Sequence, residues 1–156
     1  MKNIFKLQDY EVYSVTTIEG GLLNANIATW VMQSAMKGKR VIVALDKDDL
    51  TIRMVKSSGI FNLNLLSQKQ SNLINLLGRK SGKDIDKFKK LNYFLDSRGC
   101  PYLLEAVGYI QAKVLNSMDS LDHEVFVCEV LNAKVLNPDE PVLKLNYLRS
   151  KKLVRG

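Results

Sequence analysis

The sequence predicts a mainly β protein, an antiparallel and Greek-key-like split β-barrel with short helices inserted in mid-chain. Segments rich in valine, isoleucine, threonine and tyrosine recur along the chain and stop at glycine, proline or acidic turns, as strands do. Strand-like segments outnumber helical ones, and no regular strand–helix alternation indicates a doubly wound sheet. A closed or split barrel is the economical arrangement because closure removes exposed strand edges.

The first strands are expected to form a hairpin. Residues 10–17 alternate loosely between apolar and polar side chains and lead to Gly20 and Gly21, and residues 24–30 are the expected partner strand. Residues 41–45 form a short continuous apolar run that ends in an acidic turn. This run predicts a buried strand.

The inserted helices are expected in the middle of the chain. Residues 51–56 predict a short helix that Gly59 ends. Residues 60–66 alternate apolar side chains with asparagine, which favours a strand with one wet face. Residues 70–77 place leucines on one side of a second short helix, and residues 78–90 predict a basic surface loop.

The last third of the chain is expected to return to β structure. Residues 102–115 and 124–135 predict a long hairpin joined by a polar turn. After Pro138 and Pro141, residues 142–148 predict a final strand. The length of 156 residues suits one domain, residues 1–156, with a core of its own.

Composition and charge indicate the compartment in which the protein acts and the kinds of partner that it binds. No apolar run approaches the roughly 20 residues of a membrane helix, and the N-terminus has no signal-peptide core, so we expect a soluble, cytoplasmic protein. Cys100 and Cys128 form no metal-binding pattern and are expected to be inert buried thiols, although the sequence leaves a disulfide between them open. The net charge of +7 favours anionic partners, which include nucleic acids and phosphate-bearing cofactors.

Two phosphate-binding motifs are absent from the sequence. Gly78 to Gly82 is one residue short of P-loop spacing, and Asp84 follows Lys83 where a P-loop has serine or threonine. No GxGxxG pattern supports a Rossmann site. The densest basic cluster, residues 79–83, lacks the interleaved aromatic residues that a nucleic-acid groove would carry.

Trp30 and His123 are the only residues of their type in the chain. For Trp30 the residue type favours a core or dimer-interface aromatic, but its small and hydroxyl-bearing neighbours would let backbone amides approach a planar or phosphorylated ligand. For His123 the alternative to a binding role is a strand-end residue paired with Asp122. A catalytic triad around it has no support in the sequence.

Several motifs occur in a recognisable order: residues 24–33, 41–45, Thr51, 58–66, 81–88, 99–106 and 121–130. In that order they resemble the flavin reductase-like, FMN-binding split-barrel family, and most closely its flavoredoxin-like group. The resemblance spans residues 12–147, and the order of several weak motifs is more specific than any one of them. The chain departs from many members at residues 37–40, where they carry a Pro-Pro pair, and at Lys113, where they carry cysteine.

The resemblance implies an FMN site. Thr51, with the amides that follow it, would hold the phosphate at a helix start, and the backbone of Thr29–Val31 would meet the edge of the flavin ring. Lys87, or Lys83 in its place, would put a cation near the reduced flavin; the alternative for both is a solvated surface position. The side chains that the resemblance matches to the site are Asn24, Trp30, Thr51, Lys87, His123 and Tyr147.

The implied function is that of an oxidoreductase in which NAD(P)H reduces FMN and the electrons leave to free flavin or to a protein acceptor. No side chain is expected to act in covalent catalysis or to bind a metal. One alternative is an electron-transfer protein whose FMN is reduced by another protein, and another is a small basic barrel that binds nucleic acid. Family members resemble one another in forming dimers with flavin near the subunit boundary, so we expect a homodimer.

Overall fold

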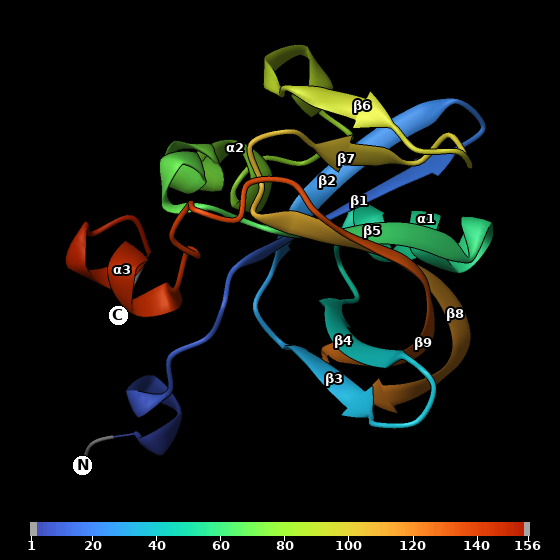
Figure 1. Ribbon diagram of the computed structural model, residues 1–156, viewed down its shortest axis with the longest axis horizontal. Helices are drawn as coiled ribbons and strands as arrows, with labels where there is room; N and C mark the ends of the chain where they lie inside the picture. Colours follow the sequence, from blue (N-terminus) through green and yellow to red (C-terminus); the bar gives the residue numbers. More distant parts are fainter. Residues whose placement is uncertain (1–2, 155–156) are drawn as a thin grey trace.

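A seven-stranded antiparallel sheet forms the body of the protein in the computed structural model, which describes residues 3–154 (Figure 1). The strand order is β2-β1-β5-β8-β9-β4-β3, and a separate hairpin of β6 and β7 lies against the sheet. The strands are β1 (Tyr13–Glu19), β2 (Leu22–Ala28), β3 (Val31–Ala35), β4 (Arg40–Asp46), β5 (Ile60–Leu65), β6 (Tyr93–Leu95), β7 (Pro101–Leu103), β8 (Gly108–Ser120) and β9 (His123–Val135).

The helices are short and lie between strands or at the chain ends. Two apolar clusters form the core, one under α2 and α3 and the other between α1 and the strands β4, β5 and β9. None of the helices within residues 3–154 is long and apolar enough to cross a membrane. The helices are η1 (Ile4–Leu7), α1 (Leu50–Ser58), η2 (Gln68–Leu73), α2 (Ile74–Gly78), η3 (Lys87–Lys90) and α3 (Leu145–Ser150).

The curled sheet is split between β2 and β3. These two strands are neighbours in sequence but stand at opposite ends of the strand order, so Thr29 and Trp30 carry the chain across the split. The mainly β, antiparallel fold is confirmed, and the sheet is not closed into a barrel by strand pairing. Backbone N–H and C=O groups on the free edge of β2 therefore have no neighbouring strand with which to form hydrogen bonds.

The first inserted helix is confirmed, and its end has a local cause. Gly59 adopts a left-handed conformation with φ of 73°, and its N–H donates to the carbonyl of Val55 at 2.8 Å. A side chain at this position would be strained, so glycine favours the stop. α1 buries Ile52, Met54 and Val55, which fixes its first turn against the sheet beside β2.

The prediction of a wet face on β5 was wrong. Asn62 and Asn64 are fully buried because the β6–β7 hairpin covers them. Asn62 Nδ2 donates to Asp96 Oδ2 at 2.9 Å, and Asn64 Oδ1 accepts the N–H of Leu103 at 2.8 Å. Asparagine serves here as a buried hydrogen-bonding residue, because its amide satisfies the backbone and carboxylate of the covering hairpin.

The predicted strand over residues 142–148 is also wrong. Val142 forms only an isolated bridge with Ser67, and α3 begins at Leu145. The N–H of Leu145 donates to the carbonyl of Tyr10 at 2.8 Å, after which the helix turns Leu148 into the core. The long hairpin is confirmed as β8 and β9, and both strands run closer to the turn than predicted.

β4 and β9 are apolar on both of their faces. One face, which includes Val43 and Phe126, is buried in the core. The opposite face forms a second apolar surface, because Met32 pairs with Ile42, Ile42 with Val127, and Val125 with Met118. We call this surface the outer apolar face, and it consists of Trp30, Met32, Ile42, Met118, Val125 and Val127.

Candidate functional site

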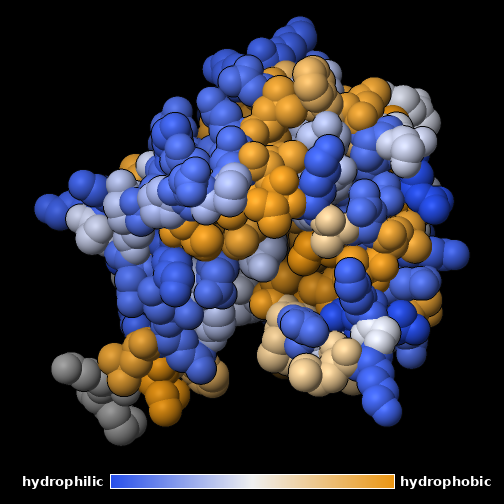
Figure 2. Space-filling view, in the orientation of Figure 1, coloured by the Kyte–Doolittle hydropathy of each residue, from blue (hydrophilic) through white to orange (hydrophobic). Residues whose placement is uncertain are grey.

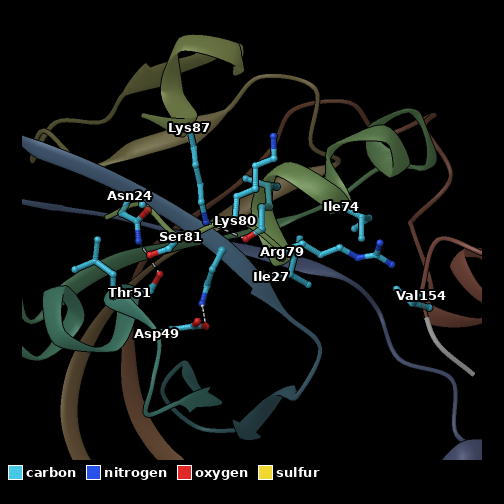
Figure 3. A pocket seen from close by; sticks show the side chains of 15 residues that line it. Asn24, Ile27, Asp49, Thr51, Ile74, Arg79, Lys80, Ser81, Lys87 and Val154 are labelled. Carbon is cyan, nitrogen blue, oxygen red and sulfur yellow. Dashed lines mark hydrogen bonds between the residues drawn. The ribbon is translucent and has the colours of Figure 1, made fainter. Parts of the chain in front are cut away.

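A cavity of about 610 Å³ runs along the free edge of β2 (Figure 3). The start of α1, the helix α2 and the loop after α2 surround it, so polar groups from distant parts of the chain converge there. Its lining includes Asn24, Asn26, Ile27, Asp49, Thr51, Ile74, Arg79, Lys80, Ser81, Gly82, Lys87 and Val154.

Asn24 and Thr51 meet at one end of this cavity. Asn24 Nδ2 donates to Thr51 Oγ1 at 3.0 Å, and both side chains are almost fully buried. Asn24 Oδ1 is buried and has no hydrogen-bond partner within residues 3–154. Gly82 passes so close that a Cβ there would lie 2.2 Å from Asn24 Oδ1 and 3.2 Å from Leu50 Cδ2. The loop after α2 is therefore packed directly over the first turn of α1.

Asn26 and Asp49 form a second pair in the middle of the cavity. Asn26 Nδ2 donates to Asp49 Oδ2 at 2.9 Å, while Asn26 Oδ1 is buried without a partner in the described part of the chain. Two residues apart on β2, Asn24 and Asn26 point to the same side of the strand. Buried acceptors without donors are costly, so the two amide oxygens fit a ligand that brings hydroxyl or N–H donors.

Cationic side chains lie on the side of the cavity that α2 and the loop after it form. Arg79 and Lys80 line the cavity, and Arg79 Nη2 donates to the carbonyl of Leu153 at 3.0 Å. Val154, the next residue, also lines the cavity (Figure 3). This side of the cavity therefore suits an anionic group, whereas Asp49 makes the middle unfavourable for one.

Lys87 is buried at the cavity wall, with 4% of its surface exposed. Its ammonium donates to the carbonyl of Ala25 at 2.6 Å and to that of Leu77 at 3.0 Å, so it joins the edge of β2 to α2. Burial lowers the pKa of Lys87, and the nearby Asp49 carboxylate opposes that shift. Lys87 is thus a cation with structural bonds that also faces the candidate site.

A smaller cavity of about 200 Å³ continues the site toward the split in the sheet. It shares Asn26 and Asp49 with the larger cavity and is lined further on by Thr29, Trp30 and His123. The ring centroids of Trp30 and His123 are 4.8 Å apart, and their planes are inclined by 53°. The two cavities together form one elongated site with a cationic wall and an aromatic end.

The structure brings together most of the residues predicted for the site. Asn24, Thr51 and Lys87 line the larger cavity, and Thr29, Trp30 and His123 line the smaller one. Val31 packs into the inner core, and Tyr147 lies in α3, where it packs beside an apolar cluster. Neither side chain lines the larger or the smaller cavity of the site, and the carbonyl of Trp30 already accepts the N–H of Ala44 at 3.0 Å.

Among the cavity residues that sequence reasoning missed, four carry the polar character of the site: Asn26, Asp49, Arg79 and Lys80. Arg79 and Lys80 belong to the densest basic cluster of the chain, and Asp49 ends the acidic turn before α1. Asn26 lies two residues after Asn24, so strand periodicity places both on one face. The basic cluster, the acidic turn and the strand periodicity can be recognised in the sequence, but only the fold shows that these four side chains line one cavity.

The split antiparallel sheet and its elongated cavity are the features of a flavin reductase-like domain. The chain belongs to the flavin reductase-like family: the model described as "Flavin reductase like domain" matches residues 8–152. The family that the order of motifs indicated is therefore confirmed.

Named relatives cover most of the chain. "High molecular weight rubredoxin" of Moorella thermoacetica is 30% identical over 145 residues, which are 92% of this chain and 63% of that protein. "Ferric-chelate reductase (NAD(P)H)" of Archaeoglobus fulgidus is 31% identical over 92% of this chain and 86% of its own. An FMN-binding protein from Thermus thermophilus has the same fold, with a TM-score of 0.81, 20% identity, and coverage of 88% of this chain and 77% of its own. The chain thus spans less than two thirds of the rubredoxin relative.

Proposed function

We propose that the chain binds FMN along the two connected cavities, oxidises NAD(P)H and passes the electrons to free flavin or to a protein acceptor. The observation that carries the proposal is the pair of buried acceptors without donors, Asn24 Oδ1 and Asn26 Oδ1, between a cationic wall and an aromatic end. The hydroxyl groups of a ribityl chain are donors of the kind that these oxygens lack.

The charged side chains of the cavity indicate which end suits the phosphate of FMN and which end suits the flavin ring. The phosphate belongs near the first turn of α1, on the side of the cavity that the loop with Lys80 lines, since a helix start and a cationic group both favour an anion. Asp49 keeps the phosphate away from the middle, where its carboxylate can accept from ribityl hydroxyls. The ring then belongs at the Trp30 and His123 end.

When bound, FMN supplies the capacity to accept a hydride and to release electrons. The residues of the chain bind and orient it. Thr51 holds Asn24 in place, Asn26 and Asp49 hold each other, and the aromatic pair limits water at the ring. Lys87 lines the larger cavity and not the smaller one, so its cation would favour the phosphate rather than the ring.

Spectroscopic binding measurements test both the identity of the cofactor and its orientation in the cavity. Lys80→Gln is expected to weaken FMN binding about five- to tenfold and to leave riboflavin, which has no phosphate, unaffected. Lys83→Gln is the matched control, because Lys83 does not line the cavity. Equal losses for FMN and riboflavin would contradict the proposed phosphate end, and no binding of either by the native chain at micromolar levels would refute the site.

Turnover separates the proposed enzyme from an electron-transfer protein. The native chain with FMN should lose flavin absorbance on addition of one equivalent of NADH or NADPH under anaerobic conditions, and two or more equivalents of a ferric chelate, each ferric ion accepting one electron, should restore it. The name of the Archaeoglobus relative motivates the choice of a ferric chelate as acceptor. Bound FMN that neither nucleotide reduces would favour the electron-transfer alternative.

We also propose a homodimer that acts in the cytoplasm. The outer apolar face supports the dimer, because Trp30, Met32 and Met118 remain 51%, 59% and 65% exposed. Apolar patches of this kind mark interaction surfaces. Cys100 and Cys128 are both buried and unpaired, which agrees with a reducing compartment. Light scattering that gives the mass of one chain at micromolar concentration would refute the dimer.

A further inference from the structure

One end of the larger cavity extends beyond the position proposed for FMN. Figure 3 shows Ile74, Arg79 and Val154 together at the side of the cavity away from Asn24 and Thr51. The phosphate of FMN belongs near Thr51, so this end stays open when FMN is bound as proposed. We call it the side lobe, and it consists of Ile27, Ile74, Arg79 and Val154.

The walls of the side lobe are mostly apolar. Ile74 is buried in the apolar cluster under α2 and α3, and Ile27 and Val154 pack against the same cluster. Figure 2 shows hydrophilic side chains over the part of the surface where α2 and α3 lie, at the left, so the apolar side chains of the lobe are turned inward. Apolar cavity walls with a few polar groups are typical of sites for organic ligands.

Arg79 supplies the charge of the side lobe. Its Nη2 donates to the carbonyl of Leu153, and no carboxylate within residues 3–154 forms an ion pair with it. A guanidinium has five N–H donors on a planar group, so donors remain for a ligand. It pairs with phosphate through two parallel bonds and stacks on aromatic faces, which suits a phosphorylated base.

The turn that ends α3 holds Arg79 in place. The N–H of Leu153 donates to the carbonyl of Leu148 at 3.0 Å. The N–H of Lys152 donates to the carbonyl of Arg149, also at 3.0 Å, and the two bonds form a Schellman motif. Lys152 has a φ of 56°, a left-handed conformation that a residue with a Cβ rarely adopts. This turn directs the carbonyl of Leu153 at Arg79, so the wall of the lobe is preformed.

The side lobe is continuous with the aromatic end of the site. Ile27 lines both cavities, and Trp30 and His123 line the smaller one. A dinucleotide with its redox ring beside Trp30 therefore reaches the lobe along Ile27. The phosphate of FMN lies at the opposite side, near the first turn of α1, so the two anionic groups occupy different positions.

We propose that the side lobe binds the adenosine phosphate half of a dinucleotide, with the phosphate on Arg79 and the adenine beside Ile74 and Val154. NAD(P)H and FAD share this chemistry. The inference rests on the proposed function and assigns a ligand to the part of the cavity that FMN leaves open. A free inorganic anion fits less well, because apolar walls offer it no hydrogen bonds.

ADP is the probe for the side lobe. It is titrated by calorimetry into the full chain saturated with FMN, so that the phosphate position of FMN is already filled. Arg79→Gln keeps an amide donor for the carbonyl of Leu153 but removes the charge, and is expected to weaken ADP binding at least fivefold and to change FMN affinity less than twofold. Arg98→Gln is the matched control at an exposed arginine outside both cavities, and should leave both affinities within twofold.

A second pair of variants leaves Arg79 intact. Val154→Glu places a carboxylate in the lobe and should also weaken ADP binding at least fivefold. Val135→Glu makes the same change at a valine that is 67% exposed and lines neither cavity, and should have no such effect. The proposal is overturned if the native chain binds no ADP at millimolar levels, or if Arg79→Gln and Val154→Glu bind it like the native chain.

Kinetics and flavin titration distinguish the two sources of the adenosine phosphate. If it belongs to the electron donor, Arg79→Gln should raise KM for NADH or NADPH at least fivefold with kcat within twofold, because the lobe binds a part of the donor that does not react. If it belongs to a flavin dinucleotide, the same variant should lose affinity for FAD at least fivefold and not for FMN. Unchanged values in both measurements would overturn the assignment.

Photolabelling locates the adenine. Irradiation with 8-azido-ADP should label the tryptic peptide of residues 70–79, which carries Ile74 and Arg79, and excess ADP should suppress the label. Labels confined to other peptides would contradict the proposal. The same labelling is run without FMN, so a chain that is labelled at residues 70–79 but binds no flavin would support the side lobe and contradict only the proposed function.

Discussion

The indole of Trp30 lies 4.8 Å from the imidazole of His123, measured between ring centroids, at an inclination of 53°. Trp30 links β2 to β3, whereas His123 begins β9, so the contact joins the split in the sheet to the β8–β9 hairpin. The bond from the N–H of Ala44 to the carbonyl of Trp30 holds the backbone of this link against β4. The pair makes a fixed aromatic wall at one end of the candidate site.

Replacing Trp30 tests this wall. Trp30→Ala should weaken FMN binding about three- to tenfold, because an aromatic contact contributes about 0.5–1.5 kcal/mol beyond area burial. Trp30→Phe should retain most of the affinity. The free energy of unfolding in Trp30→Ala should fall by about 1–3 kcal/mol, because about half of the indole surface is buried and packs on His123. Unchanged FMN affinity in Trp30→Ala, measured by flavin fluorescence, would remove Trp30 from the site.

Gly82 offers a steric test at the other end of the site. In Gly82→Ala the new Cβ would lie 2.2 Å from Asn24 Oδ1, and Asn24 cannot move freely because it is buried and bonded to Thr51. The loop must shift, so FMN affinity should fall at least tenfold, and the free energy of unfolding by about 1–3 kcal/mol. Isothermal titration and denaturant unfolding measure the two effects.

Gly78 is the matched control for Gly82. Gly78 also lines the larger cavity, but a Cβ there would meet only the side chain of Ile27, with Cγ1 at 3.5 Å and Cβ at 3.8 Å, which are ordinary contacts. Gly78 is the last residue of α2, where alanine favours the helix. Gly78→Ala should leave FMN affinity within about twofold and stability unchanged or higher. If both variants bound FMN like the native chain, the loop could not be part of the site.

The β class, the first helix and several residues that line the candidate cavities could be predicted from the sequence because those features are local or ordered along the chain. Gly59 ends α1 through its own backbone preference, and Asn24 and Thr51 stand in motifs of the family. The errors have a common physical cause. Asn62 and Asn64 are buried because the distant β6–β7 hairpin covers them, and Val142 and Lys144 meet distant segments only in isolated bridges that do not extend into a strand. Periodicity within one segment does not contain that information.

Cys100 and Cys128 should be unreactive in the native protein. Burial raises the pKa of each thiol to about 12, so very little thiolate is present at pH 8. Both are free, and no disulfide joins them. A thiol reagent such as Ellman's should modify neither residue over an hour in buffer and both in denaturant. Rapid modification of one native thiol would show that its environment opens more readily than its burial indicates.

Lys87 makes stability depend on pH in a defined direction. Burial lowers its pKa below 10.5 in the folded chain, so over the interval between the folded and unfolded pKa values the unfolded chain binds more protons. Stability from this group therefore rises as pH increases through that interval.

Lys87→Met removes the titration and leaves the carbonyls of Ala25 and Leu77 without their donor, which should cost about 1–3 kcal/mol at pH 7. The difference in unfolding free energy between the native chain and Lys87→Met, measured with urea, should grow between pH 7 and about pH 10. A difference that shrinks with pH would mean that the folded chain holds the Lys87 proton more tightly than the unfolded chain, and that the bonds to the two carbonyls outweigh the desolvation of the ammonium.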